Sequence, residues 1–398
     1  MVDEKLRRAR AGLTQVIEPA DALGVVSAQA WGPLRLLEII QGASPTQHEW
    51  QALTAHDAED EQLAKKITRH LGDAIERWRR RSAYLKPDEA LGFITRMGGR
   101  FVIPEDEHWP AALADLGVTE PLGLWMLGDA KIPLADRVLG LVGSREATTY
   151  GEAATKMLAT KARQMEITVL SGGAYGIDAH AHRQAMLAEG TGVPTVAILA
   201  GGLDRLYPAG NTDLLREITQ EGVLITEMPP GMRPNRYRFL NRNRLIAALS
   251  TATIVVEARY RSGALNTANH AHDLDRAVGA VPGPIHAPSS AGCHRLIKET
   301  PTVLIDDSSD LESIYSDMFA ANQRSEGDED QRHYDMLSVE ELLVFDALPV
   351  RGMTTVEHLC GITGLAVPMI TGILTKLERH ELAELDARGW RKHRNTRS

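Results

Sequence analysis

The feature that most constrains the fold is a series of short runs rich in Val, Ile and Leu after Pro87, each followed by a turn and a stretch with helical spacing. Strands that are apolar along their whole length are typical of a parallel sheet covered by helices. We therefore expect an α/β core with an extended Rossmann-like parallel sheet. The predicted strands are residues 138–142, 167–170, 195–199, 223–226, 253–257 and 277–281.

Three further segments flank this core. Apolar residues recur at helical spacing between about Leu34 and Arg81, which predicts a helical N-terminal domain. The stretch after Asp317 is polar and acidic, as expected of a solvated linker. Beyond it, three short amphipathic helices and a hairpin predict a winged helix. The expected domains are residues 1–90 (helical), 91–316 (core), 317–336 (linker) and 337–398 (winged helix).

The composition excludes several classes of protein. No segment approaches the roughly eighteen consecutive apolar residues of a membrane span, and the N-terminus lacks the apolar region of a signal peptide. Cys293 and Cys360 are far apart, so neither a disulfide framework nor a thiolate zinc site is indicated. The net charge of −9 argues against uniform coating of nucleic acid, but it allows one basic patch. We expect a cytoplasmic protein.

Two predicted strands run directly into Gly-containing turns that open helices. Glycine lets a ligand approach the backbone, and free N–H groups at a helix N-terminus attract anions such as phosphate. Adjacent parallel strands would bring both turns to the same carboxyl edge of the sheet. Neither turn is a dinucleotide fingerprint or a P-loop, and tight turning alone is the alternative explanation for the glycines. The turn residues are Gly143, Ser144, Arg145, Ser171, Gly172 and Gly173.

Arginines alternate with aromatic residues in the segment RPNRYRFLNRNRLIAALS. Guanidinium groups pair with phosphates and aromatic rings stack on bases, so the pattern favours single-stranded nucleic acid binding over a solvated charged face. We expect the segment to begin as a loop and to enter a helix at about Asn241. Its candidate residues are Arg233, Arg236, Arg238, Arg242, Arg244, Tyr237 and Phe239.

Other candidates for chemistry have simpler explanations. Glu257 ends a predicted strand, where a structural bond to a backbone N–H is favoured over contact with a sugar hydroxyl. His180 and His182, like His270 and His272, stand two residues apart and do not share a helix face, which argues against a metal site. No Ser, Cys or carboxylate pair has a spacing that names a nucleophile and its base. We therefore expect no catalysis, no metal and no cofactor.

Five segments in one order resemble the motif series of the DprA/Smf family over residues 96–300. They are VGSREATTYG, SGGAYGIDAHAH, RFLNRNRLIAALS, VVEARYRSGALNTA and AVPG. The resemblance implies a Rossmann-like domain that binds single-stranded DNA, forms a homodimer and loads the RecA recombinase during natural transformation. WGPLRLLEIIQ is similar to the family's helical N-terminal domain, which is of the SAM or helix-hairpin-helix kind.

The resemblance also implies roles for individual residues. Arg145 and Arg236 match DNA-binding basic positions, and Phe239 matches a base-stacking aromatic residue. Phosphate-binding positions match Gly172, Gly173, Arg242 and Arg244, and Arg276 before the AVPG strand is a further candidate.

Two alternatives use the same fold differently. A phosphoribohydrolase of the LOG type would carry a PGGxGT signature, which AVPGPIHAPSSAG does not contain. A small-nucleotide sensor would bind a mononucleotide and use the C-terminal domain as its output. Release of free base from a nucleoside monophosphate would identify the first, and displacement of an oligonucleotide by a mononucleotide would identify the second.

Overall fold

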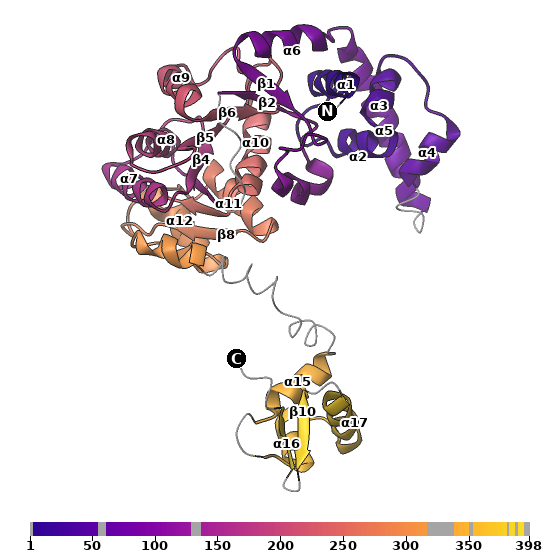
Figure 1. Cartoon of the computed structure of the whole chain (residues 1–398), viewed down its shortest axis with the longest axis vertical. Helices are drawn as coiled ribbons and strands as arrows, with labels where there is room; N and C mark the ends of the chain where they lie inside the picture. The colour runs from indigo at the N-terminus through magenta and orange to yellow at the C-terminus, as the bar shows by residue number, and fades with distance from the viewer. Residues whose placement is uncertain are drawn as a thin grey trace. The chain divides into compact units, whose positions relative to one another are not determined.

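The chain divides into two compact units, Met1–Ile314 and Tyr315–Ser398 (Figure 1). The computed structural model describes residues 3–54, 61–128, 137–316, 338–349, 353–379, 382–386 and 389–393. The linker predicted at residues 317–336 lies outside these described residues.

The N-terminal part of the first unit is helical, as the apolar spacing predicts. Asp3 caps the first helix by accepting a hydrogen bond from the Lys5 backbone N–H, and Pro33 and Pro87 stand in the first turns of later helices. Leu36, Ile75 and neighbouring side chains form its core, while α1 and α6 pack against the first strand of the sheet. The helices are α1 (Glu4–Val16), α2 (Ala22–Trp31), α3 (Pro33–Ile40), α4 (Gln47–Thr54), α5 (Glu61–Ser82) and α6 (Pro87–Arg96).

Within the described residues, nine strands form one sheet in the order β1-β2-β6-β5-β4-β3-β7-β8-β9. Strands β3 to β9 pair in parallel, whereas β2 is antiparallel to both β1 and β6. The six predicted strands are present, each within two residues of its expected bounds. The strands are β1 (Gly99–Val102), β2 (Leu124–Leu127), β3 (Val138–Val142), β4 (Thr168–Gly172), β5 (Thr195–Ile198), β6 (Val223–Thr226), β7 (Ala252–Val255), β8 (Ala277–Ala280) and β9 (Val303–Leu304).

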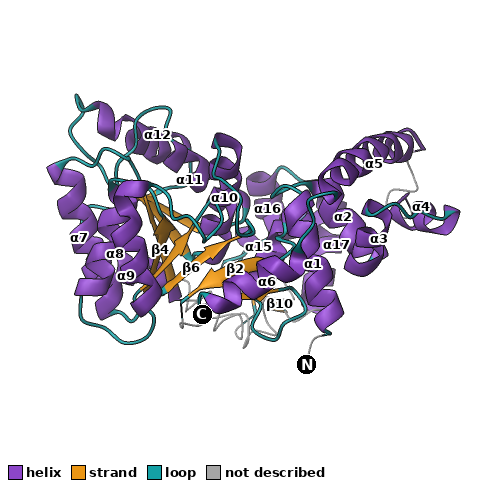
Figure 2. Cartoon of the chain, turned by 90° about the horizontal axis from the view of Figure 1, so that it is seen from above, coloured by secondary structure: helices purple, strands orange, loops and turns teal. Residues whose placement is uncertain are grey.

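Helices cover both faces of the sheet, with α7, α8 and α9 on one side and α10 and α11 on the other (Figure 2). The expectation that a helix starts at about Asn241 is wrong by five residues. Asn235 caps α10 by accepting a hydrogen bond from the Arg238 backbone N–H, so the helix already begins at Arg236. These helices are α7 (Thr149–Gln164), α8 (Ile177–Leu187), α9 (Thr212–Glu221), α10 (Arg236–Leu249), α11 (Gly263–Asp273) and α12 (Ala291–Glu299).

The order of the strands creates a switch point between β3 and β7. Strands β4, β5 and β6 continue the sheet on one side of β3, and β7, β8 and β9 continue it on the other. Val142 and Val255 stand opposite each other near the carboxyl ends of β3 and β7. The chain leaves these two strands toward opposite faces, which opens the crevice where ligands bind in open α/β sheets.

The described residues of the C-terminal unit form three helices and a two-stranded antiparallel sheet, as the sequence pattern predicts. Ser338 and Glu341 form a reciprocal capping box at the start of the first helix. Leu359, Ile370, Leu374 and Leu377 are fully buried between the helices. The elements are α15 (Val339–Ala347), α16 (Val356–Thr363), α17 (Val367–Arg379), β10 (Ala383–Asp386) and β11 (Gly389–Lys392).

In the part of the chain that the structure describes, no single helix is long and apolar enough to cross a bilayer. One pair of helices there, α16 and α17, has the combined length and composition of a span but is bent by 108°.

Candidate functional site

A cleft of about 380 Å³ opens at the switch point between β3 and β7. Four parts of the chain build it: the turn after β3, the start of α8, the first half of α10 and the loop that leads from β7 into α11. We refer to this cleft as the crevice. Its described lining includes Gly143, Ser144, Arg145, Asp178, Phe239, Arg242, Arg259 and Arg261.

The turn after β3 contributes an exposed arginine from a fixed backbone. The Ile177 backbone N–H donates to the Ser144 carbonyl at 3.0 Å, which ties this turn to the start of α8. Gly176 has a φ of +72°, and a Cβ there would lie only 2.2 Å from the Ser144 carbonyl oxygen, so a side chain cannot be accommodated. Arg145 is exposed and therefore projects from a backbone that β3 and the start of α8 hold in place.

An aromatic residue and an arginine meet at the mouth of the crevice. The Arg145 guanidinium carbon lies 5.3 Å from the centroid of the Phe239 ring, and the ring of Tyr207 lies 5.8 Å from the same centroid. Phe239 is half-buried on α10, while Tyr207 is 52% exposed. Arg236 is exposed one helical turn before Phe239. A planar ring flanked by cations is the arrangement on which a base can stack while its phosphate is neutralised.

Arg242 and Asp178 lie buried at the floor of the crevice. Burial lowers the pKa of Arg242 to about 10; the carboxylate of Asp178 opposes this shift, and the positive charge of Arg145 adds to it. Burial likewise raises the pKa of Asp178, against the attraction of Arg242. Nη1 of Arg242 donates to the Ile198 carbonyl, but its Nε, although buried, has no hydrogen-bond partner among the described residues.

This environment favours an anionic ligand. Arg242 is only 7% exposed, and a buried donor without a partner costs free energy until a ligand or water accepts from it. Arg145 and Arg242 also repel each other across the crevice, and a bound phosphate would offset that repulsion.

The end of β4 and the turn that follows it do not line the crevice in the way that the sequence predicts. Ser171, Gly172 and Gly173 are all buried, and the Ser171 hydroxyl donates to the Leu141 carbonyl at 2.5 Å. A Cβ on Gly172 would lie 2.1 Å from Nη1 of Arg242, so this glycine makes room for the guanidinium. The carboxylate of Asp178 already accepts from the Ala174 N–H at the start of α8, at 3.3 Å. These residues shape the floor of the crevice instead of holding phosphate directly.

Two arginines for which DNA contacts are predicted have protein partners away from the crevice. Arg244 is 3% exposed and donates to both carboxylate oxygens of Glu227 at 2.7 Å, as well as to the Thr119 carbonyl. Arg276 directly precedes β8, at the amino edge of the parallel sheet and away from the crevice, where it pairs with Asp115. Arg244 is therefore placed to stabilise the fold, and Arg276 lies at the edge of the sheet opposite to the crevice.

The sequence patterns assign no role to some residues at or beside the crevice. Arg259 and Arg261 stand in the loop after β7, and their place directly after a predicted strand is a signal that could have identified them. Tyr207 carries no such signal, because its contact with Phe239 joins loops and helices distant in sequence. Glu257 accepts hydrogen bonds from the backbone N–H and the hydroxyl of Thr148, at 2.9 and 2.7 Å. These bonds confirm the structural role that its position at the end of a strand predicts.

The histidines that follow the glycine turns also have structural surroundings. His182 is fully buried, with its Nε2 2.8 Å from the Gly172 carbonyl and its Nδ1 2.6 Å from the Thr195 hydroxyl. His180 faces Glu152 at 3.2 Å. Over the residues that the structure describes, no group of three or more His, Cys, Asp or Glu side chains is placed to hold a metal ion.

Comparisons with known proteins give a consistent result. Residues 100–316 match the family model described as DNA recombination-mediator protein A. A Mycobacterium tuberculosis (strain H37Rv) protein assigned as DNA processing protein DprA is 43% identical over 313 residues, which cover 76% of this chain and 79% of that protein. Protein Smf of Synechocystis is 31% identical, over 71% of this chain and 69% of its own. The crystal structure of DNA processing protein A from Streptococcus pneumoniae superposes with a TM-score of 0.55 at 25% identity, covering 74% of this chain and 98% of that one.

Proposed function

This chain belongs to the DNA recombination-mediator protein A family, and on that premise we propose that its crevice binds single-stranded DNA and that the protein works by binding, without catalysing a reaction. The family assignment covers DNA processing and recombination. The strand preference, the binding residues and the protein partners are our proposals.

One observation supports the proposal most strongly: the crevice combines an aromatic ring with several cations. Phe239 offers a ring with Arg145 over it, and Arg242 lies below with an unpartnered Nε. Stacking on a side chain requires a base whose face is not already covered by its neighbours, which favours a single strand over a duplex. The contacts are directed at the phosphate, the sugar and the π-face of any base, so we expect tolerance of many sequences.

Equilibrium binding of a labelled oligonucleotide, measured by fluorescence anisotropy across a salt series, tests this proposal. A strand of about thirty nucleotides should bind more tightly than its duplex, and its affinity should fall steeply as salt rises. Equal affinity for the duplex would contradict the proposal.

The same assay separates the two alternative functions. A mononucleotide contacts only part of an extended groove and should not displace the strand at micromolar concentration, whereas a nucleotide sensor would be displaced. A phosphoribohydrolase would release free base from a nucleoside monophosphate, and we expect no release. We also propose that the protein uses no cofactor or metal.

The protein partners follow from the family by analogy. We propose that the protein forms a homodimer and loads the RecA recombinase onto single strands, with natural transformation as the setting. Adding the protein to RecA and a single strand coated by a single-strand-binding protein should shorten the delay before RecA filaments form. An unchanged delay would contradict the loading role while leaving DNA binding intact.

The division of the chain into domains is also proposed. Residues 1–90 would form the helical domain, 91–316 the core, 317–336 the linker and 337–398 a winged helix, since three helices followed by a strand pair are the elements of that fold. The exposed part of α17 carries few cations, with Lys376 paired to Glu341, which argues against reading a DNA groove. The two free cysteines fit a reducing cytoplasm.

A further inference from the structure

A second hollow borders α10, and residues of the helical N-terminal region form most of its walls. Its volume is about 460 Å³. Glu18 and residues 20–23, which include the start of α2, form one wall, Arg77, Trp78 and Arg81 of α5 form another, and Tyr237 of α10 closes it. None of these residues belongs to the crevice described above.

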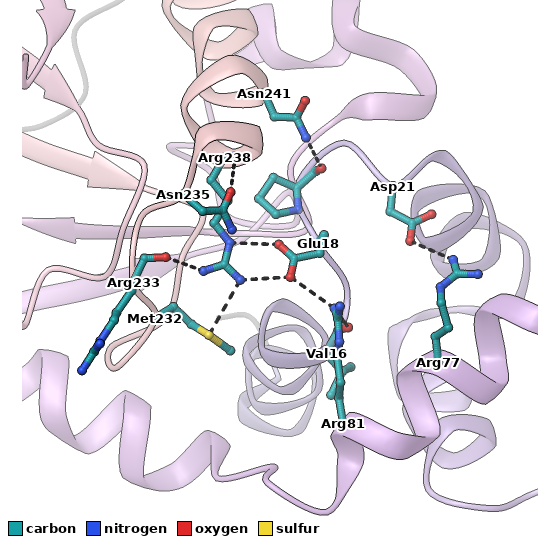
Figure 3. A network of polar contacts seen from close by, with 11 residues as sticks. Val16, Glu18, Asp21, Arg77, Arg81, Met232, Arg233, Asn235, Arg238 and Asn241 are labelled. Atoms are coloured by element: carbon teal, nitrogen blue, oxygen red, sulfur yellow. Dashed lines mark hydrogen bonds and ion pairs between the residues drawn. The ribbon is translucent and has the colours of Figure 1, made fainter.

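A network of polar contacts holds this hollow in place beside α10 (Figure 3). Nε and Nη2 of Arg238 each donate to a carboxylate oxygen of Glu18 at 2.9 Å, and Arg81 donates to the same carboxylate at 3.3 Å. The Asn241 side-chain amide donates to the Pro19 carbonyl at 2.9 Å. The side chain of Arg238 is only 10% exposed, so its bonds to Glu18 are partly shielded from water and are stronger than surface contacts.

Two arginines and two carboxylates line the hollow, and the adjoining Arg238 gives the cations a surplus of one. Arg238 and Arg81 share the single carboxylate of Glu18, while Arg77 approaches Asp21 only at 4.0 Å. The Arg77 side chain is 55% exposed, and exposed ion pairs of this kind contribute little free energy. Arg77 can therefore exchange its carboxylate partner for a phosphate at small cost.

The first turn of α10 adds to this surplus. It contains Arg236 and Arg238 and no acidic residue, although the N-terminus of a helix carries partial positive charge and is normally flanked by carboxylates. Cations at this end are unfavourable unless an anion lies close to them. Glu18 supplies one such anion for Arg238, whereas Arg236 remains exposed.

The exposed arc of α10 connects the crevice to the hollow. Successive residues on an α-helix are separated by about 100°. Phe239 therefore lies about 60° to one side of Arg236, and Tyr237 lies about 100° to the other. Tyr237 is 54% exposed and Leu240 between them is 41% exposed, so the surface from ring to ring is open to solvent.

We propose that a DNA strand held in the crevice continues over the first turn of α10, past Arg236, into this hollow, where a base stacks on Tyr237 and a phosphate pairs with Arg77. The helical N-terminal region thereby forms the second half of the binding path. This inference rests on the proposed function, because it extends the same strand.

Strand length provides the test, with the full-length protein and oligothymidylates of two lengths. A strand of about four nucleotides fits the crevice alone, whereas one of about thirty also reaches the hollow. Arg77→Gln and Tyr237→Ala should each weaken binding of the long strand about tenfold and leave the short strand unchanged. Arg77→Gln should also lower the slope of log affinity against log salt by about one for the long strand.

Matched controls come from the same region of the chain. Arg8 is 58% exposed on α1 and Tyr84 is 82% exposed after α5, and neither lines the crevice or the hollow. Arg8→Gln and Tyr84→Ala should bind both strands like the unmodified protein. Retained binding of the short strand also shows that each test variant is folded.

The outcomes separate this inference from the proposed function. If the unmodified protein binds both lengths and the two test variants bind the long strand normally, the path over α10 is wrong and the crevice stands. Equal weakening of short and long strands would assign Arg77 and Tyr237 a structural role and overturn the path. Failure of the unmodified protein to bind either strand would overturn both proposals.

Discussion

The guanidinium of Arg145, on the turn after β3, lies over the ring of Phe239, on the second turn of α10, at 5.3 Å from the ring centroid. The two residues are far apart in the sequence: Arg145 stands on the turn that leads from β3 into α7, Phe239 stands on α10, and these two helices cover opposite faces of the sheet. Their contact shows that two motifs distant in the sequence lie together on one surface at the switch point.

Replacing Phe239 tests whether this surface stacks on a base. Phe239→Ala should weaken binding of a thirty-nucleotide strand by about tenfold, because base–aromatic stacking contributes on the order of 1–3 kcal/mol. Phe239→Trp should keep most of the affinity, since it retains a stacking face. Anisotropy titrations at fixed salt measure both, with Tyr84→Ala as an exposed aromatic control. Equal loss in the Ala and Trp variants would point to altered packing instead of lost stacking.

The buried pair of Arg244 and Glu227 predicts a defect in folding and not in binding. Arg244→Met leaves the Glu227 carboxylate buried without its partner and should lower the free energy of unfolding by about 3 kcal/mol. Adding Glu227→Gln should recover part of the loss, because the unpaired charge is then removed. Urea denaturation measures stability, and titration of the folded protein should show unchanged affinity. Normal stability with weakened binding would return Arg244 to the DNA-binding residues.

Substitution of Asp178 should increase the affinity of the protein for the DNA strand. The carboxylate of Asp178 lines the crevice beside Arg242, where it competes with any phosphate for that guanidinium. Asp178→Asn keeps the size of the side chain and should raise affinity for the strand about threefold, while lowering stability because the charge of Arg242 loses its counterion. Anisotropy and urea denaturation measure the two effects. Weaker binding in this variant would show that the carboxylate orients Arg242 for the ligand.

His182 predicts a loss of stability in acid. Burial lowers its pKa from 6.5 to about 4, so the unfolded chain takes up a proton at a pH where the folded protein does not. The unfolded state then binds more protons between pH 6.5 and 4, and stability must fall as the pH drops through that window, by a few kcal/mol at most. Urea denaturation at several pH values measures this effect. The variant His182→Gln should be less stable at neutral pH but should lose less stability on acidification; an equal loss would assign the effect to other groups.

Much of the fold can be predicted from the sequence, because the central strands are apolar throughout and end in glycine turns. Strands β3 to β8 follow from this pattern. Strand β9 is only two residues long, and β1 and β2 join the sheet in antiparallel orientation without a glycine turn that opens a helix, so no local pattern marks them. Their pairing depends on contacts distant in sequence.

The candidate site, like the fold, can be predicted from the sequence only in part. Arg145, Arg242 and Phe239 could be predicted because their chemistry matches a motif, and all three line the crevice. The surroundings of Arg244 could not be predicted from the sequence. Arg242 and Arg244 stand two residues apart on one helix but face different directions: Arg242 faces Asp178, and Arg244 faces Glu227. Residue type alone does not distinguish a guanidinium that faces a ligand from one that is already paired.

The central claim is that the crevice binds a single strand of DNA, and the double variant Arg145→Ala with Arg236→Ala tests it most directly. Both arginines are exposed beside Phe239, so their loss should not disturb folding. In anisotropy titrations with a thirty-nucleotide strand, the double variant should bind at least about tenfold more weakly for every base composition, and the salt slope should fall by about two. Unchanged affinity and an unchanged slope would show that the strand binds elsewhere on the protein.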